Sequence, residues 1–369
     1  MNELPVHNDI LFYMLYGGVT VMAVIACCYM LFRRSNAFMP HITSPVRLRR
    51  CAAAYFAAVA LSHVLWVLLG DFRLIDDPYV CYAVAIGLDI VMLDSTMMAM
   101  LLSMLQDRRR PLWPIVVAMV PIVAVVAVCI VRRSNVLDPL LETYDLLLNA
   151  LFIINMVYAL RQYRRWLHDN YADLEHKEMW VGSVAISIII LQFVVYSKDS
   201  RSLTFMYFVE VLDFMLICLI LWRVETLQQL DAPSTQKWNL VEEPTAPAAA
   251  PSTISSNIGK LLEQHCEATQ LYLRHDLTLL QLSEAVGTNH TYLSQHFAQQ
   301  GMNYNAYING LRIQHFINLY HEAIATQRPF TAQQLANESG FRSYSTFSAA
   351  FKQRMGQTVT SWMHDTAEK

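Results

Sequence analysis

The chain has 369 residues, of which 55% are hydrophobic and only 15% are charged, and its formal net charge is −3. An average soluble domain carries about 25% charged residues. The deficit is concentrated before residue 224, where Lys and Arg flank long apolar runs without entering them. Such runs between basic clusters are what a lipid bilayer requires, so a purely soluble protein is excluded. The small net charge gives no general signal for polyanion binding.

Seven apolar segments are long enough to cross a hydrocarbon core of about 30 Å as helices. They are Ile10–Phe32, Cys51–Gly70, Tyr79–Leu105, Leu112–Val131, Leu141–Leu160, Trp180–Tyr196 and Leu203–Trp222. Only helices fit, because backbone groups inside lipid must be hydrogen-bonded within their own segment. Residues 1–227 are therefore predicted to form a seven-span transmembrane domain.

Basic residues between the segments predict their orientation. With the N-terminus outside, the inner loops hold 13 Lys and Arg residues and the outer loops hold 5. This bias favours an N-out, C-in arrangement, because cytoplasmic loops carry the excess of Lys and Arg. An odd number of spans then delivers everything after Trp222 to the cytoplasm.

Carboxylates lie near the middle of two predicted spans. Asp89 and Asp94 belong to the third span and Glu210 and Asp213 to the seventh, and His63 is their one candidate cationic partner in the spans. A charge at this depth costs several kcal/mol, so these groups are expected to face the bundle interior. Two interpretations stay open: a polar site for a proton, a cation or a small ligand, or hydrogen bonds that hold the bundle together.

Residues 228–257 differ from both flanking regions. They contain Pro233, Pro244, Pro247 and Pro251 among Ala, Ser and Thr, with almost no apolar periodicity. A segment of this composition cannot bury a core, so a disordered linker is predicted. It would tether residues 258–369 to the membrane domain.

Residues 258–369 show helical periodicity and no strand-like runs, so the whole chain is predicted to be all-α. Two stretches repeat the order helix, glycine-containing turn, helix. Gly287 and Gly340 are 53 residues apart, whereas Phe297 and Phe351, in the second helices, are 54 apart. The pattern predicts two helix-turn-helix units joined by a long helix at about 304–324. Such a pair places two second helices in neighbouring turns of the DNA major groove.

These stretches resemble the AraC-type family of bacterial transcriptional regulators. The matching residues in the first repeat and the long helix are Leu282, Ser283, Thr291-Tyr292-Leu293-Ser294, Phe297, Gly301, Tyr307 and Leu311-Arg312-Ile313. Those in the second repeat are Leu335-Ala336, Gly340-Phe341, Ser345-Thr346-Phe347-Ser348, Phe351-Lys352, Gly356-Gln357-Thr358 and Trp362. Val359 stands where the family usually has Pro, and Met363 where it often has Arg.

The resemblance implies sequence-specific DNA binding by two recognition helices, at about His290–Gln299 and Tyr344–Arg354. The side chains expected to face DNA are His290, Thr291, Ser294, Gln295, Arg342, Tyr344, Ser345, Thr346 and Lys352. From Ile258 onward eight acidic residues oppose eight basic ones. A neutral domain releases few counterions, so its affinity for DNA is predicted to be modest and salt-sensitive.

The leading hypothesis is a one-component transcription regulator in the bacterial cytoplasmic (inner) membrane, with the seven-helix bundle as sensor. Its expected partners are promoter DNA, the lipid bilayer and a small molecule or ion in the bundle. The bundle would act on the DNA-binding domain either by forming a homodimer or by a shift of the seventh helix. No nucleophile, metal signature or phosphate-binding loop is present, so no enzyme activity, metal or cofactor is expected. The alternatives are a transporter, an intramembrane enzyme or a receptor, and a helix-turn-helix tail that makes only protein contacts.

Overall fold

The computed structural model describes residues 9–33, 44–70, 72, 74–134, 136–174, 203–227, 229–230 and 258–367. Over these residues the regular elements are all helices, and the only β-type pairing is one isolated bridge between Tyr171 and Thr278. The all-α prediction is confirmed. The chain divides into two compact units, Met1–Tyr163 with Met179–Ala232, and Arg164–Glu178 with Pro233–Lys369. Residues 164–178 thus group with the C-terminal part of the chain.

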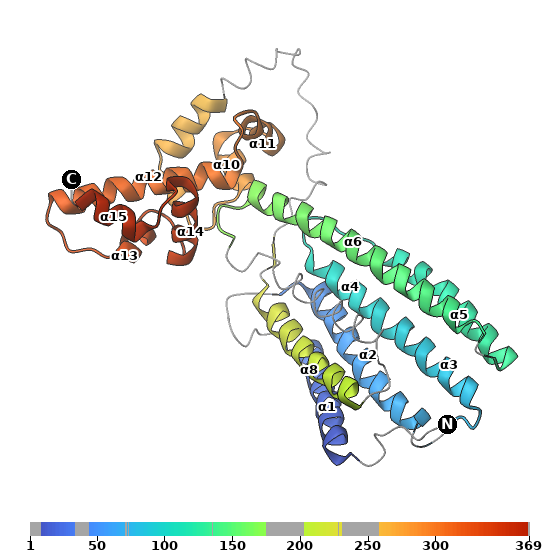
Figure 1. The fold of residues 1–369 in the computed structure, drawn as a ribbon. Coiled ribbons are helices and arrows are strands. Elements are labelled where there is room, and N and C mark those ends of the chain that lie inside the picture. Colours follow the sequence, from blue (N-terminus) through green and yellow to red (C-terminus); the bar gives the residue numbers. More distant parts are fainter. Residues whose placement is uncertain are drawn as a thin grey trace, which may run out of the picture. The chain divides into compact units, whose positions relative to one another are not determined.

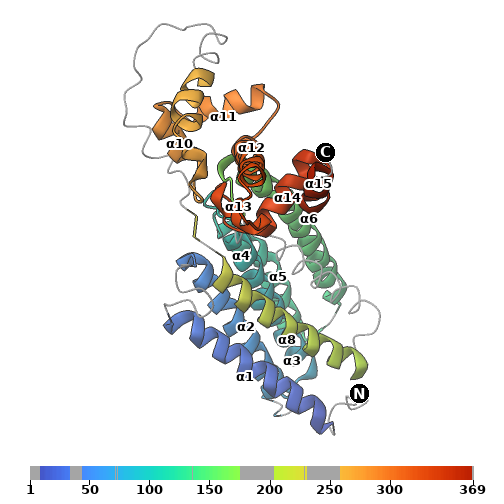
Figure 2. The same ribbon diagram turned by 90° about the vertical axis from the view of Figure 1, so that its left-hand side faces the viewer.

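The first unit consists of long apolar helices (Figures 1 and 2). They are α1 (Ile10–Phe32), α2 (Val46–Gly70), α3 (Pro78–Asp89), α4 (Ser95–Met104), α5 (Trp113–Arg132), most of α6 (Asp138–Asn170) and α8 (Leu203–Thr226). A π-helical turn, Ile90–Asp94, joins α3 to α4 in one run. Within the described residues, six helices are long and apolar enough to cross a membrane. The remaining predicted span, Trp180–Tyr196, lies outside the described residues.

Apolar side chains cover both the inside and the outside of this unit. Phe12 of α1 packs edge-to-face on Tyr207 of α8, with ring centroids 5.5 Å apart. Met98, Ile115 and Leu141 join α4, α5 and α6 in a buried cluster. Large apolar side chains such as Val120 also point outward and are exposed. Exposed apolar surface of this extent is typical of sites that contact a membrane or another protein.

A buried ion pair ties three helices together at one end of the first unit. Arg49 of α2 donates a hydrogen bond to Glu225 Oε1 of α8 over 3.0 Å, and the Tyr29 hydroxyl of α1 donates to Glu225 Oε2 over 3.1 Å. Arg49 also donates to the carbonyl oxygen of Met30, near the C-terminal end of α1. A cation is favourable there, because the last carbonyl groups of a helix carry partial negative charge.

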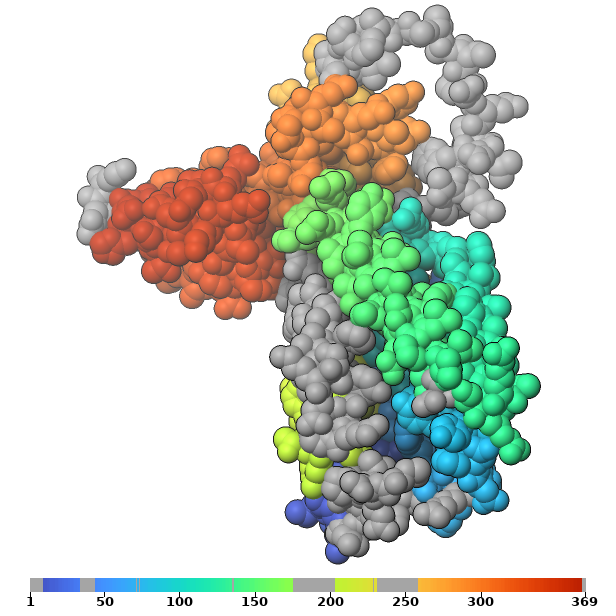
Figure 3. Space-filling model, turned by 45° about the vertical axis from the view of Figure 1, so that its right-hand side comes forward, coloured from blue at the N-terminus to red at the C-terminus, as the bar shows by residue number. Residues whose placement is uncertain are grey.

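The second unit contains the two helix-turn-helix motifs. Residues 258–262 are helical and lead into a π-helical turn, Glu263–Glu267, and a 3-10 turn, Leu271–Leu273. The first motif is α10 (Leu279–Val286) with α11 (His290–Gln299), and the second is α13 (Ala332–Glu338) with α14 (Tyr344–Met355). The long helix α12 (Tyr304–Ala325) joins them, and α15 (Val359–Ala367) follows. Within this unit the two halves form an orange and a red lobe (Figure 3).

Local sequence signals explain where these helices begin and end. Asn289 accepts a hydrogen bond from the Thr291 amide over 2.9 Å and caps α11, and Ser343 caps α14 through the Thr346 amide over 3.3 Å. Both types of residue are preferred N-caps, because their side-chain oxygen satisfies an otherwise free amide. Gly287 ends α10 in the left-handed conformation, with φ of +73°.

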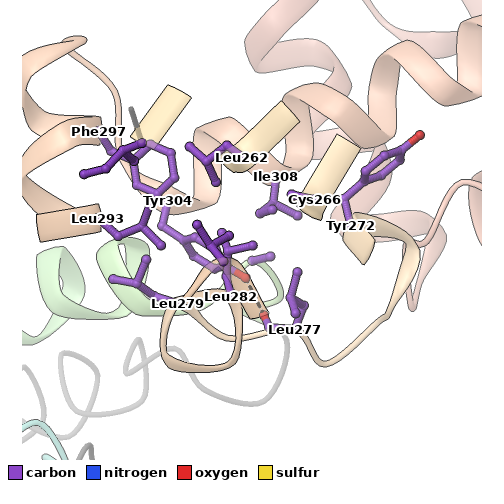
Figure 4. Close-up of a cluster of buried hydrophobic side chains, with 13 residues drawn as sticks. Leu262, Cys266, Tyr272, Leu277, Leu279, Leu282, Leu293, Phe297, Tyr304 and Ile308 are labelled. Carbon is purple, nitrogen blue, oxygen red and sulfur yellow. Dashed lines mark hydrogen bonds between the residues drawn. The ribbon is translucent and has the colours of Figure 1, made fainter. Parts of the chain in front are cut away.

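Each half of the unit has its own apolar core. The first contains Leu282, Leu293 and Phe297 together with Tyr304 of α12, whose hydroxyl donates a hydrogen bond to the Leu277 carbonyl (Figure 4). The second contains a cluster of aromatic rings around Phe316, including Phe347 and Phe351. The two motifs thus have separate apolar cores, and α12 contributes residues to both.

The backbone of the second turn lies directly against the first half. Gly340 has φ of +92°, and a Cβ atom on it would lie only 2.8 Å from Leu273 Cα and 2.9 Å from Leu273 O. Gly287 has a similar φ, but a Cβ atom there would meet nothing within 4 Å.

We therefore expect Gly340→Ala to destabilise the second unit more than Gly287→Ala. Both variants introduce left-handed strain of about 1–2 kcal/mol, but only Gly340→Ala adds a backbone clash. Hydrogen exchange of the α12 and α13 amides in the full chain, read by mass spectrometry, measures the difference. Equal exchange in the two variants would contradict the close approach of Gly340 to Leu273.

Candidate nucleic-acid interface

Helix α11 presents its predicted DNA-facing side chains on the side opposite its core contacts. Leu293 and Phe297 are buried, whereas Thr291 and Gln295 are exposed. His290 and Ser294 are half-buried at the edge of the same surface. The helical repeat of 3.6 residues produces this division. The exposed groups are neutral hydrogen-bonding side chains, which suit base edges and phosphate oxygens.

Some of the residues of α14 that are predicted to face DNA lie close to its N-cap residue, and others are exposed. Ser345 is exposed, and its hydroxyl lies 2.9 Å from the hydroxyl of the N-cap residue Ser343. The hydroxyl of half-buried Thr346 lies 3.1 Å from the same Ser343 oxygen. Tyr344 packs partly on the second core, with its ring centroid 5.8 Å from that of Phe347. Lys352 is exposed near the end of the helix.

Arg342, just before α14, is held by an acidic residue from the first half. Its guanidinium donates a hydrogen bond to Asp276 Oδ1 over 3.2 Å, and the Asp276 side chain is exposed. An exposed ion pair of this kind contributes about 0–1 kcal/mol, so Arg342 can exchange Asp276 for another anion at little cost.

His296 lies on the inner side of α11 and is 4% exposed. Its Nε2 atom lies 3.0 Å from Gln300 Nε2. Burial lowers the pKa of His296 from its ordinary value of 6.5, because the charged form loses hydration. Burial also lowers the pKa of His290 at the start of the same helix. Both rings therefore favour the neutral form.

The five predicted intramembrane residues do not share one set of contacts in the described part of the structure. Asp89 accepts hydrogen bonds from Ser62 and Trp66 of α2. Asp94 instead accepts one from Asn149 of α6 over 3.1 Å. The two aspartates therefore face different helices.

The other predicted polar residues lie near α1 and on α8. His63 Nδ1 is 2.8 Å from Thr20 Oγ1, and the ring of Tyr16 stacks on the His63 ring with centroids 4.3 Å apart. Glu210 is buried, and its Oε2 atom has no hydrogen-bond partner among the described residues. Asp213 lies one helical turn further along α8. The described contacts do not gather the five residues into one cluster.

Asp145 is a polar residue of α6 that was not predicted from the sequence. The Asn149 side-chain amide donates to Asp145 Oδ1 over 3.0 Å and thereby bridges Asp145 and Asp94. The spacing of four residues between Asp145 and Asn149 was a detectable signal, because such residues share one helix face. Across the described part of the chain, no group of three or more His, Cys, Asp or Glu residues is arranged to hold a metal ion.

Comparison with known proteins places the C-terminal helices in a family. The model of the helix-turn-helix domain family matches residues 282–365, which contain α11 to α14 in full. The C-terminal unit carries an AraC-type helix-turn-helix domain. This unit is homologous to HTH-type transcriptional regulators, so the resemblance seen in the sequence is confirmed for this part of the chain.

The matched relatives are proteins of Staphylococcus aureus. An uncharacterized HTH-type transcriptional regulator of strain MRSA252 is 31% identical over 120 residues, which are 31% of this chain and 15% of the relative. Regulators of the same description from strains COL and N315 are 30% identical over 120 residues, with the same shares. The chain thus spans only a small part of the length of these relatives. No solved structure matches the chain.

We expect the first helix-turn-helix motif to lose stability as the pH falls below about 6.5. The folded state lowers the pKa of His296, so the unfolded state binds more protons in that range. The stability is complete above the unfolded pKa and declines as the pH falls from there towards the folded pKa. Pulse proteolysis of the full chain in urea, at pH 7.5 and pH 5.5, measures the change.

His296→Gln provides the control, because its side-chain amide can still form a hydrogen bond with Gln300 but cannot titrate. The loss of stability between the two pH values should be smaller in this variant. An unchanged pH dependence would show that other groups cause the loss.

Proposed function

We propose that this protein is a membrane-embedded one-component transcription regulator. In this proposal the second unit binds promoter DNA on the cytoplasmic side, and the apolar helices form a sensor in the bacterial inner membrane. The observation that carries the proposal is the AraC-type domain in a chain whose other unit has helices long and apolar enough to cross a membrane. The matched relatives are described as HTH-type transcriptional regulators, which agrees with this proposal.

The two recognition helices supply the DNA contacts in this proposal. α11 offers neutral hydrogen-bonding groups, with Thr291 and Gln295 the most exposed. The second motif adds charge through Arg342 and Lys352. The first motif would then contribute base contacts, and the second would contribute most of the attraction to phosphate.

The domain limits of the proposal are 1–227 for the membrane part, 228–257 for the linker and 258–369 for the DNA-binding part. The N-out, C-in orientation rests on the distribution of Lys and Arg between the loops. The protein is proposed to act by binding and not by catalysis, and we expect it to need no cofactor. A homodimer would place two weak DNA-binding domains at high local concentration.

Polar groups inside the first unit support the sensor part of the proposal. The carboxyl group of Asp89 and the pair Asp94–Asp145 receive hydrogen bonds from neutral donors, and the described residues include no Lys or Arg side chain bonded to any of the three. A protonation change or a small cation would alter such contacts and the packing of α2, α3 and α6. Buried ionisable groups at this depth are typical of functional sites.

We expect Lys352→Ala to weaken DNA binding of the intact protein about fivefold, since one contact to a phosphate is lost. The DNA is a promoter fragment recovered from genome-wide occupancy of the protein. The slope of log affinity against log salt should fall by about 0.9. Fluorescence anisotropy across a salt series measures both quantities.

Lys260→Ala is the matched control for this experiment. Lys260 is also exposed in the second unit, but it lies outside both recognition helices. Its loss should leave the affinity and the salt slope nearly unchanged. Equal effects of the two variants would mean that α14 does not contact the DNA. If the protein occupied no site in the genome, the regulator proposal would be rejected.

The proposed orientation predicts the location of each end of the chain. A green fluorescent protein fused after Lys369 should be fluorescent, and alkaline phosphatase at the same place should be inactive, because the C-terminal end is cytoplasmic. Alkaline phosphatase fused after Val136, in a predicted outer loop, should be active. The reverse pattern would place the DNA-binding unit out of reach of the chromosome.

A further inference from the structure

The first helix-turn-helix half contains a peptide segment from elsewhere in the chain. Tyr171 and Ala172 follow α6, and Asn305 of α12 donates hydrogen bonds to both of their carbonyl oxygens, over 3.1 Å and 2.8 Å. Asn309 donates a further hydrogen bond to the Ala172 carbonyl over 3.3 Å. In Figure 3 the light green end of α6 meets the orange lobe of the same unit.

The segment is part of the apolar core and not only a surface contact. Ala172 is fully buried, and it clusters with Leu279, Leu282 and Leu293, which are among the residues shown in Figure 4. Tyr171 forms a bridge with Thr278, the residue that caps α10. The segment therefore touches the helix that begins the first motif.

Polar groups on α12 are arranged to receive this segment. Asn305 and Asn309 lie four residues apart and on one face, and Asn309 Nδ2 also donates to Asn305 Oδ1 over 3.2 Å. The two side chains thus support each other while they bind consecutive carbonyl groups. Asp173 is buried, and its carboxylate attracts the buried guanidinium of Arg312.

We propose that residues 164–174 are a docking segment for the first helix-turn-helix half, and that this half is complete only when its own chain occupies the site. The segment is covalently continuous with α6, which contains the fifth predicted span. Loss of docking would leave Asn305, Asn309 and part of the core open to water and would loosen α10 and α11. A movement of α6 would then alter DNA recognition by α11 without any force transmitted through the predicted linker at 228–257. The consequence for DNA rests on the proposed function, whereas the docking itself does not.

Photo-crosslinking in the full chain tests the docking. The photoreactive amino acid p-benzoylphenylalanine replaces Tyr171 in one protein and Tyr158 in a control. Tyr158 lies within α6, but its side chain is 67% exposed and it belongs to the first unit. After irradiation in lipid nanodiscs, mass spectrometry should find Tyr171-site crosslinks to peptides that contain Thr278 or Asn305. A mixture of ¹⁵N-labelled and unlabelled chains should show that these crosslinks form within one chain.

A matched pair of asparagine variants tests the proposed receptor. Asn305→Ala removes two of the hydrogen bonds, so the crosslink from position 171 should fall about tenfold. Asn318→Ala changes the same residue type on the same helix, but Asn318 is exposed and contacts only Gln314 in the described hydrogen bonds. This control should leave the crosslink unchanged.

Hydrogen exchange provides a second measurement that needs no unnatural residue. In the otherwise unmodified full chain, Asn305→Ala should accelerate exchange of the α10 and α11 amides about tenfold relative to Asn318→Ala. Crosslinks at the level of the Tyr158 control, crosslinks only between chains, or equal exchange in the two asparagine variants would each overturn the proposal. None of these measurements involves DNA, so their failure is distinct from failure of the proposed regulator function.

Discussion

The second unit depends on one buried cation, the guanidinium of Arg312 in the middle of α12. Arg312 is 1% exposed, and it donates hydrogen bonds to the carbonyl oxygens of Tyr272 and Arg274 over 2.8 Å and 2.7 Å. Its guanidinium carbon also lies 5.7 Å from the centre of the Phe341 ring, which belongs to the second motif. A buried charge is costly unless it is paired and fully hydrogen-bonded, so the loop at 271–275 and the turn at 340–341 must both keep their places. Arg312 thereby fixes one half of the unit against the other.

Charge links this central residue to both the docking segment and the candidate DNA surface. Burial lowers the pKa of Arg312, and attraction to Asp173 and Asp276 opposes that effect. Asp276 also holds Arg342, the basic residue at the entrance to α14. The same acid therefore interacts both with the centre of the unit and with Arg342, which it holds only through an exposed and weak ion pair. Asp173 of the docking segment and Asp276, which pairs with Arg342, therefore both lie in the electrostatic surroundings of Arg312.

The sequence allowed accurate prediction wherever local patterns determine the structure. The first predicted recognition helix, His290–Gln299, has the predicted bounds, because the cap Asn289 and the turn residue Gly287 mark its start and the end of the helix before it. Apolar length likewise identified the six described long helices. The docking segment was not predictable, because Asn305 and Asn309 bind backbone carbonyl groups, which every residue has. The partner of Asp94 was missed for a related reason: the Asn149 amide comes from another helix, and only tertiary packing brings it there.

The balance of charge in the second unit agrees with the proposed function, in which this unit belongs to a regulator held at a membrane. A soluble DNA-binding protein gains affinity from excess Lys and Arg, because each phosphate contact releases counterions. This unit has equal numbers of acidic and basic residues after Ile258, and at least one of its candidate phosphate ligands is paired with an acid. Such a unit gains little from non-specific attraction to DNA, so in the proposed function more of its discrimination between sites comes from neutral groups on α11. In the proposed membrane-tethered regulator, weak non-specific binding is an advantage, since a tether would already limit the DNA within reach, and strong attraction to any nearby duplex would hold the unit away from its operator.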